Sequence, residues 1–173
     1  ALPNVDRPDD PYARLARLGW TLPPAIAVPP HVVLPFAFVH LVGEDRAIVS
    51  GHGPQDVVDG SIAGPFGRVG VELTIDEGIE AARLTALSVF GSLHRALPNG
   101  LASVKQWVRI RGMVSCGPDF ELHPRVINGF SDAVIAVFGP EKGAHARCAV
   151  GQSSLPFKTP VEVEAEVLLE KPS

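Results

Sequence analysis

Hydrophobic positions recur along the chain with two different spacings, and these spacings predict the elements of its fold. A spacing of about 3.6 residues follows Thr74 and Glu77, which match a capping box, and continues to the Pro-Asn-Gly at residues 98–100. A second stripe of the same spacing follows His123 and Pro124, which we expect at the N-cap and the first helical position, and it ends at a Gly-Pro pair. We therefore predict two long amphipathic helices.

Apolar and polar side chains that alternate mark the predicted strands. Residues 31–42 and 46–50 are rich in β-branched and aromatic side chains and flank a Gly-Glu-Asp turn, which predicts a hairpin. Residues 104–115, 146–151 and 160–169 are the other predicted strands. In the first of these three, the alternation puts on one side Trp107, Arg109, Arg111 and Met113, and on the other Val108 and Ile110.

The order hairpin, helix, strand, helix, strand, strand predicts an α+β fold, in which a mixed β-sheet carries its two long helices on one face. A short helix around Leu15 and a linker with four prolines precede the sheet. We assign residues 1–30 to this N-terminal extension and residues 31–173 to a single domain. Because the chain offers no further layer for the other face of the sheet, we expect oligomerisation to cover that face.

Composition and charge narrow the class of protein. The 173 residues, 46% of them apolar, suffice for one domain with a sizeable core. Lys and Arg number 15 against 19 Asp and Glu, and this net charge of -4 argues against binding to nucleic acid. The longest apolar stretch, residues 31–43, is shorter than the roughly 20 residues of a membrane-spanning helix. With two cysteines and no signal-peptide pattern, we expect a cytoplasmic protein without membrane contact.

Several familiar catalytic patterns do not fit this sequence. The six histidines and two cysteines lack the spacing of metal ligands. Gly51-His52-Gly53 begins like a dinucleotide-binding loop, but Pro54 follows where a further glycine and a helix belong, so a tight loop at a strand end fits better. Ser50 lacks the glycines that surround the nucleophile of a serine hydrolase. We therefore predict no metal, no dinucleotide-binding loop and no serine-hydrolase nucleophile.

The last predicted strand carries a row of carboxylates. Glu162, Glu164 and Glu166 point to the face opposite the apolar residues between them. A solvated face is the commoner meaning of such a row. If oligomerisation covers it, at least one carboxylate must find a partner or have a raised pKa, and either condition suits a general base. Arg147 in the preceding strand would form a salt bridge with one of these glutamates or bind a substrate carboxylate.

These two strands also carry a resemblance. Residues 146–150 (Ala-Arg-Cys-Ala-Val), then Leu155-Pro156, then residues 161–165 (Val-Glu-Val-Glu-Ala) resemble the C-terminal signature of the Rid (YjgF-like) family, also called endoribonuclease L-PSP-like. The likeness extends over about residues 31–170. It implies a chorismate-mutase-like fold, assembled as a homotrimer around a barrel-like centre, with ligand clefts between the subunits.

The resemblance also implies a function, the hydrolytic deamination of reactive 2-imino and enamine acids to 2-oxoacids and ammonia without a cofactor. At the matching positions, Arg147 and Glu162 are the implied catalytic residues. Arg147 would clamp the substrate carboxylate, helped by the backbone N–H of Gly51, and Glu162 would orient or activate the attacking water. Positioning of water and substrate would do much of the catalysis.

Three further positions complete the predicted substrate-binding set. Phe36 stands where the family has a tyrosine, and Ala149 stands where it usually has a cysteine. We expect Phe36, Phe38 and the N-terminal extension to shape a more apolar pocket, and the loop at residues 57–70 to cover a cleft. Asn128 either contacts this site or is a structural residue that hydrogen-bonds the backbone.

Two other functions stay open at this point. In a non-catalytic trimeric binding protein, the same arginine would hold a small carboxylate without turnover. The ribonuclease activity attached to some relatives is disfavoured by the net charge of -4 and the lack of a basic patch.

Overall fold

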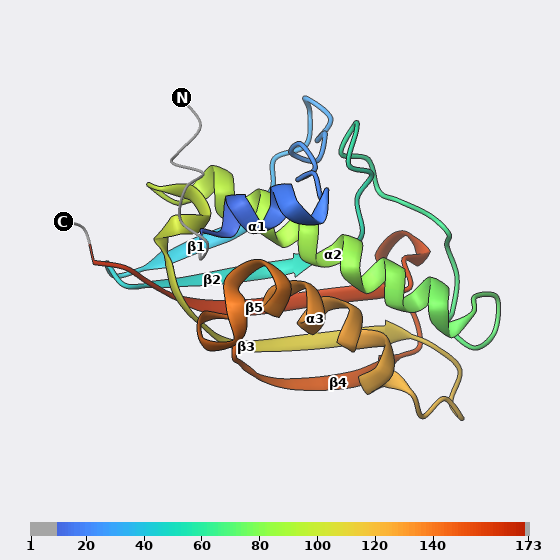
Figure 1. Ribbon diagram of the computed structural model, residues 1–173. Coiled ribbons are helices and arrows are strands. Elements are labelled where there is room, and N and C mark those ends of the chain that lie inside the picture. Colours follow the sequence, from blue (N-terminus) through green and yellow to red (C-terminus); the bar gives the residue numbers. More distant parts are fainter. Residues whose placement is uncertain (1–9, 172–173) are drawn as a thin grey trace.

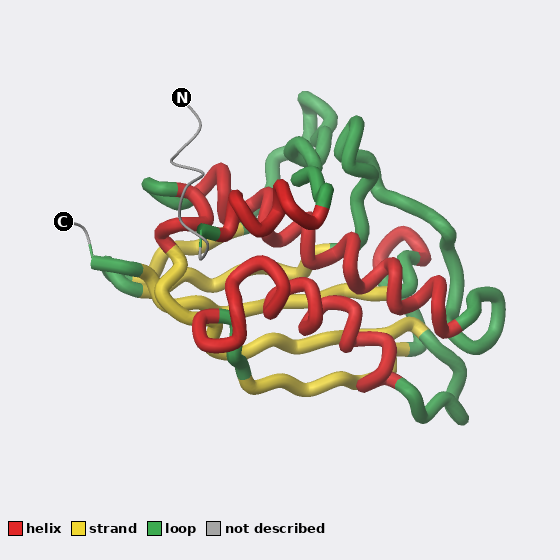
Figure 2. The backbone as a smooth tube through the Cα atoms, viewed as in Figure 1, coloured by secondary structure: helices red, strands yellow, loops and turns green. Residues whose placement is uncertain are grey.

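The computed structural model of the protein describes residues 10–171 and contains one mixed sheet with strand order β1-β2-β5-β3-β4. The strands are β1 (Val39–Val42), β2 (Arg46–His52), β3 (Val104–Ser115), β4 (Ala146–Gln152) and β5 (Val161–Leu169). The helices are α1 (Pro11–Leu18), α2 (Ile75–Ala96) and α3 (His123–Lys142), with short 3₁₀ turns η1 (Gly100–Ser103) and η2 (Pro156–Lys158). The α-helices lie together on one face of the sheet (Figures 1 and 2). This arrangement confirms the predicted α+β fold class.

Apolar side chains between the sheet and the helices form the core. Phe90 of α2, Trp107 of β3, and Phe130 and Phe138 of α3 are buried and meet in edge-to-face pairs with ring centroids 5.4 to 6.1 Å apart. Burial of each ring stabilises the fold by about 1.5–3 kcal/mol. This packing holds the strands of the sheet in place. The face of the sheet that points away from the helices carries half of the candidate site.

The two long helices begin close to the predicted signals. Both hydrogen bonds of the capping box are present, from Glu77 N–H to Thr74 Oγ1 at 3.1 Å and from Thr74 N–H to Glu77 Oε2 at 2.8 Å. The prediction that His123 is an N-cap is wrong by one residue, because Leu122 occupies the cap position and α3 begins at His123. Pro124 is tolerated one position further on, since the backbone N–H groups of the whole first turn lack partners inside a helix.

The first predicted strand is shorter than expected. Only Val39–Val42 pair with β2, and residues 31–38 run irregularly beside the end of the sheet. Ser50 holds this segment, because its N–H donates to the Phe38 oxygen at 2.9 Å and its hydroxyl donates to the Ala37 oxygen at 2.7 Å. β-branched and aromatic residues suit any half-buried surface, and here they line a cavity instead of extending a strand.

The alternation predicted for the strand at residues 104–115 is wrong near its start. The register between β3 and β5 shifts between Trp107 and Arg109, so Trp107 shares the buried face with Ile110. Arg109 and Arg111 stay exposed. An irregular residue in one strand changes the direction of the side chains that follow, and a two-residue period cannot reveal where it occurs.

The N-terminal extension contains the predicted short helix, α1, followed by an irregular linker that lies against the domain. Two side chains of the domain donate to linker carbonyls, Gln55 Nε2 to the Pro24 oxygen at 3.4 Å and Arg95 Nη1 to the Pro23 oxygen at 3.1 Å. Residues 1–9 of the predicted extension lie outside the described residues. The division of the chain into an extension and one domain stays a prediction.

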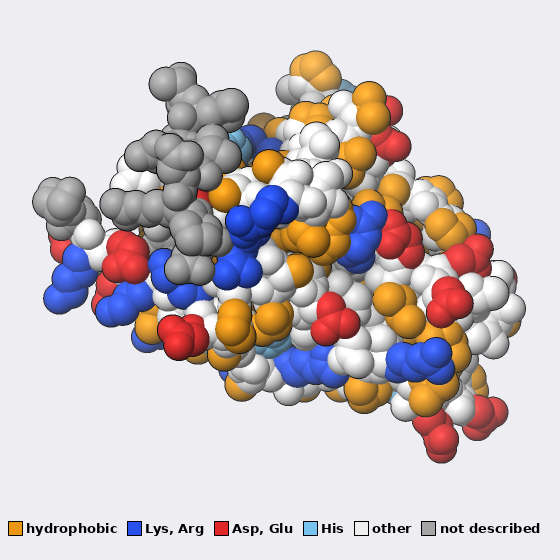
Figure 3. Space-filling view, viewed as in Figure 1, with side chains coloured by type: hydrophobic (Ala, Val, Ile, Leu, Met, Phe, Trp, Pro, Cys, Tyr) orange, Lys and Arg blue, Asp and Glu red, His pale blue; other side chains and the backbone are white. Residues whose placement is uncertain are grey.

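The two faces of the molecule differ in what covers them. On the helix side, positive, negative and apolar side chains are interspersed (Figure 3). On the other side, which we call the open face, the predicted row of Glu162, Glu164 and Glu166 is half-buried, while the apolar residues of β5 between them point into the core. Glu166 pairs with Arg46 at 3.2 Å. Within residues 10–171, no helix is long and apolar enough to cross a membrane.

Candidate functional site

The carboxylate of Glu162 lies on the open face of the sheet, against the backbone of Gly51. The register between β2 and β5 shifts between Val49 and His52, and Gly51 lies in this irregular stretch. A Cβ at Gly51 would overlap the Oε1 atom of Glu162, so glycine leaves the space in which the carboxylate rests. Two residues of the predicted site are therefore direct neighbours.

The surroundings of Glu162 shift the pKa of its carboxyl. Burial raises the pKa of Glu162 above its ordinary value, and the negative charge of Glu164 raises that pKa further. No group among residues 10–171 forms a hydrogen bond or ion pair with this carboxylate. A half-buried carboxylate with a raised pKa and no partner is suited to accept a proton from water near neutral pH.

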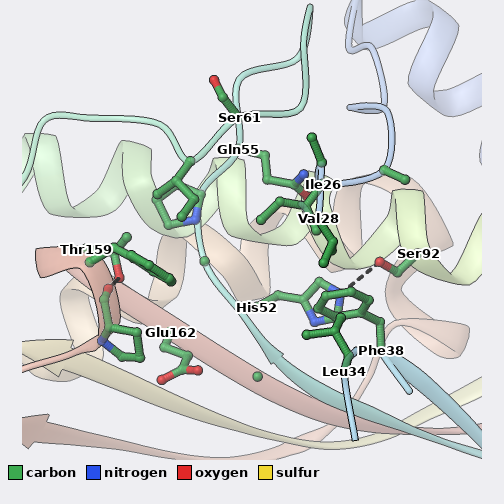
Figure 4. Close-up of a pocket in the computed structure, with 18 of the residues that line it drawn as sticks. Ile26, Val28, Leu34, Phe38, His52, Gln55, Ser61, Ser92, Thr159 and Glu162 are labelled. Atoms are coloured by element: carbon green, nitrogen blue, oxygen red, sulfur yellow. Dashed lines mark hydrogen bonds between the residues drawn. The ribbon is translucent and has the colours of Figure 1, made fainter. Parts of the chain in front are cut away.

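Glu162, Gly51 and Phe36, three of the predicted site residues, line one cavity of about 1150 Å³. In Figure 4, Glu162 lies on one side of this cavity and Ile26 and Val28 of the linker lie on another. The walls come from four parts of the chain, residues 25–39, 51–62, 92–96 and 156–162. The predicted covering loop contributes to the second of these parts, and the N-terminal extension contributes to the first.

Sequence reasoning missed two polar residues of this cavity, His52 and Ser92. The His52 Nδ1 atom lies 2.6 Å from the Ser50 oxygen, and since a carbonyl only accepts, Nδ1 carries the proton. The Nε2 atom then accepts from the Ser92 hydroxyl at 2.8 Å (Figure 4). Burial lowers the pKa of His52, so the imidazole is held neutral. The alternation of buried Ala47 and Val49 would place His52 on the opposite face, and the register shift between Val49 and His52 turns its side chain inward instead. No local pattern indicates this shift or the partner of His52 on α2.

Arg147 lies on the opposite face of the same sheet. Arg147 of β4 pairs with Ile110, which is buried under the helices, whereas Glu162 pairs with Met113 on the open side. Ala149 lies two residues beyond Arg147 and therefore on the same face. Within one chain, the residues of the predicted site therefore lie in two separate groups, on opposite faces of the sheet. We call them the open-face half-site (Glu162, Gly51 and Phe36) and the helix-face half-site (Arg147, Asn128 and Ala149).

Residues of α3 hold the guanidinium group of Arg147. Its Nη2 atom donates to Asn128 Oδ1 at 2.7 Å and to the Pro124 oxygen at 3.2 Å, and Nη1 donates to the Ser131 hydroxyl at 3.0 Å. Asn128 therefore orients Arg147 through its side chain. The salt bridge to a β5 glutamate, one of the two predictions for Arg147, does not form between described residues. The guanidinium is oriented by neutral partners and keeps its charge uncompensated.

No group of three or more His, Cys, Asp and Glu side chains in residues 10–171 is placed to hold a metal ion. The nearest approach is a pair, Cys116 Sγ and His123 Nε2, at 3.4 Å. This thiol and imidazole are only two ligands, whereas a structural zinc site uses four.

Comparisons with known proteins identify the family. No model of a known protein family matches the chain. The chain is 40% identical over 157 residues to Protein TCP17 of Trypanosoma cruzi, and the match covers 91% of this chain and 92% of that protein. A crystal structure of a protein of unknown function from Agrobacterium tumefaciens is 32% identical with a TM-score of 0.80, covering 93% of this chain and 92% of the other.

A candidate endoribonuclease from Shewanella oneidensis is 27% identical with a TM-score of 0.79, and the match covers 92% of this chain and 99% of that one. A structure of the same fold from Entamoeba histolytica, 20% identical with a TM-score of 0.53, carries the name endoribonuclease L-PSP, which is also used for the family of the C-terminal signature. The chain belongs to the Rid (YjgF-like) family. In this Rid protein the signature residues Arg147 and Glu162 fall one in each half-site.

Proposed function

We propose that this Rid protein hydrolyses 2-imino acids, and the enamines that tautomerise to them, to 2-oxoacids and ammonia. The observation that carries the proposal is the carboxylate of Glu162, which is half-buried, has a raised pKa and lies against Gly51 at an apolar cavity. A carboxylate in such surroundings accepts a proton from water more readily than an exposed one.

The proposed reaction needs only positioning and proton transfer. Water held by Glu162 attacks the carbon of the protonated imine while the carboxylate takes a proton from that water, and the product is a tetrahedral carbinolamine. The proton then passes from Glu162 to the nitrogen, the carbon–nitrogen bond breaks, and the carbonyl of the 2-oxoacid forms as the hydroxyl proton passes to the departing ammonia, which leaves as ammonium. The carboxylate is regenerated in each cycle, and the raised pKa of Glu162 suits both transfers.

We further propose that a second copy of the chain completes the site. Arg147 has the fixed guanidinium fork that recognises carboxylates, but it lies on the other face of the sheet from Glu162. The open face also exposes Val42 and Ile48, at 44% and 37% of their surface. In the homotrimer implied by the resemblance, the helix-face half-site of one subunit would meet the open-face half-site of the next and bring the substrate carboxylate to Arg147.

The test is ammonia release from 2-aminoacrylate generated in situ by a dehydratase. We expect the wild-type protein to accelerate release and Glu162→Gln to lower kcat by at least about 100-fold, because the amide cannot accept the proton of water. Glu166→Gln is the matched control, since it removes a carboxylate from the same face of β5 without touching the cavity. Equal loss in both variants, or none in either, would contradict the role of Glu162.

Some similar structures are named endoribonucleases, so ribonuclease activity is a second candidate function. Arg109 and Arg111 lie on the open face, but each pairs in register with a glutamate of β5, Glu166 and Glu164 respectively. These carboxylates would offset the attraction of the arginines for phosphate. The same two variants, incubated with single-stranded RNA, separate the candidates. Cleavage that depends on Glu162, without acceleration of ammonia release, would replace the deaminase proposal.

A further inference from the structure

The cavity beside Glu162 is much larger than a small imino acid needs. Pockets of about 300–1,000 Å³ accept drug-sized ligands. The volume here is about 1150 Å³, whereas the product of 2-aminoacrylate has only three carbons. Room is therefore left beyond the reacting group for a large substituent.

The walls of this cavity are apolar on the side formed by the N-terminal extension and the segment that follows it. Its lining includes Ile26, Val28, Val32, Leu34 and Phe38. Among the described lining residues, the charged side chains besides Glu162 are Asp59 and Arg95. An apolar surface of this kind favours hydrocarbon, because burial removes that hydrocarbon from water.

Apart from Glu162, the polar side chains of the cavity wall include His52 and Gln55, which already have partners within the chain. Both ring nitrogens of His52 are used, one with the Ser50 oxygen and one with the Ser92 hydroxyl. Gln55 donates to backbone oxygens of the linker and of Gly60. A ligand that enters therefore need not supply polar groups here, and a hydrocarbon substituent leaves no buried donor or acceptor unsatisfied.

The linker wall is a fixed part of the cavity. Arg95 and Gln55 hold the backbone oxygens of Pro23 and Pro24. At Gly60 the two backbones approach so closely that a Cβ would lie 2.8 Å from the Pro24 oxygen. Because the wall is held in this way, its apolar side chains keep a defined shape that can discriminate between substituents.

We propose that this cavity binds the side chain of the imino acid, that the preferred substrates carry a bulky apolar side chain, branched or aromatic, and that residues 25–38 set this preference. The identity of the reacting group rests on the proposed function above. The apolar residues named above all belong to residues 26–38 of the chain.

The test compares the imino acids that an amino-acid oxidase forms in situ from alanine and from leucine. Each buried methylene favours binding about fourfold, so the three additional carbons of the leucine side chain should raise kcat/KM at least about tenfold. Val32→Asp should remove most of this preference, because it should lower kcat/KM for the leucine-derived imine much more than for the alanine-derived imine. Val33→Asp is the matched control, because Val33 is the neighbouring valine, is 88% exposed and does not line the cavity.

A binding measurement separates this inference from the proposed function. Calorimetry with pyruvate and 4-methyl-2-oxopentanoate, the two products, should show tighter binding of the larger one to wild type and to Val33→Asp but not to Val32→Asp. That result supports the apolar site even if no imine is hydrolysed, in which case only the deaminase proposal fails. Imine hydrolysis without preference for the larger side chain, or equal binding of both products, overturns the inference and would fit a cavity filled by a neighbouring subunit.

Discussion

The two half-sites prepare a charged side chain in opposite ways. The guanidinium group of Arg147 donates three hydrogen bonds to residues of α3, whereas the Glu162 carboxylate has no partner among residues 10–171. A guanidinium keeps its charge at any accessible pH, so its orientation is what the protein can adjust. A carboxylate base depends on its pKa, which burial and Glu164 raise. The contrast fits the roles proposed for them, binding for the helix-face half-site and proton transfer for the open-face half-site.

The largest effect is expected at Gly51, on the proton-transfer side. In Gly51→Ala the added Cβ would occupy the position of Glu162 Oε1 and displace the carboxylate. Loss of a positioned general base lowers kcat by about 100-fold or more. Steady-state ammonia release measures kcat, and a thermal unfolding curve checks that the variant is folded.

Gly53→Ala is the control for this substitution. Its Cβ would meet no atom outside its own chain neighbours closer than 3.7 Å, so we expect near wild-type activity. If Gly51→Ala keeps the wild-type kcat, the close contact between Gly51 and Glu162 has no part in the reaction.

A smaller effect, of a different kind, is expected on the binding side. Arg147→Ala should raise KM by about 10- to 100-fold with a lesser change in kcat, because a hydrogen bond to a charged group contributes about 1.5–3 kcal/mol. Asn128→Ala should raise KM by less than about tenfold, since two of the three guanidinium contacts remain. Initial rates over a range of imine concentrations separate the two constants.

Arg125→Ala provides the comparison, because Arg125 is an exposed arginine on the same helix. It should leave KM unchanged. A fall in kcat with KM unchanged in Arg147→Ala would break the division of labour between the half-sites, as it would place Arg147 in the chemical step.

The smallest effect concerns the pH dependence of the reaction. Glu162 acts as a base only when deprotonated, so kcat/KM should be lost as the pH falls through its raised pKa, at higher pH than for an ordinary glutamate. Glu164→Gln removes the second cause of the raised pKa and should move this acid limb to lower pH without abolishing activity. A pH–rate profile of the two proteins measures the shift. An acid limb that coincides in both would show that the charge of Glu164 does not influence the base.

Much of the fold could be predicted because its signals are local. The capping box of Thr74 and Glu77 and the helical period that follows identify α2 without knowledge of any other element. The row of glutamates in β5 likewise shows its two faces in five residues of sequence. By contrast, the shift at Trp107 and the irregular course of residues 31–38 depend on packing against distant parts of the chain, which a period cannot encode.

The individual residues of the candidate site could be predicted from the sequence, but their arrangement in space could not. The resemblance indicates Arg147 and Glu162, yet their separation onto two faces follows from how β4 and β5 flank β3. Similarly, the contact between Gly51 and Glu162 exists because β2 pairs with β5, two strands far apart in the sequence. The partner of His52 on α2 is hidden for the same reason.

The linker is attached through its own backbone oxygens, and this has a consequence for how the protein can change over evolutionary time. The groups that Arg95 and Gln55 grip belong to the main chain of Pro23 and Pro24, whereas the side chains that face the cavity follow them in the sequence. Attachment and lining are thus encoded by different positions. Mutations at the lining positions can alter the range of substrates while the segment stays in place, which makes this stretch a natural starting point for redesigning the selectivity of the scaffold.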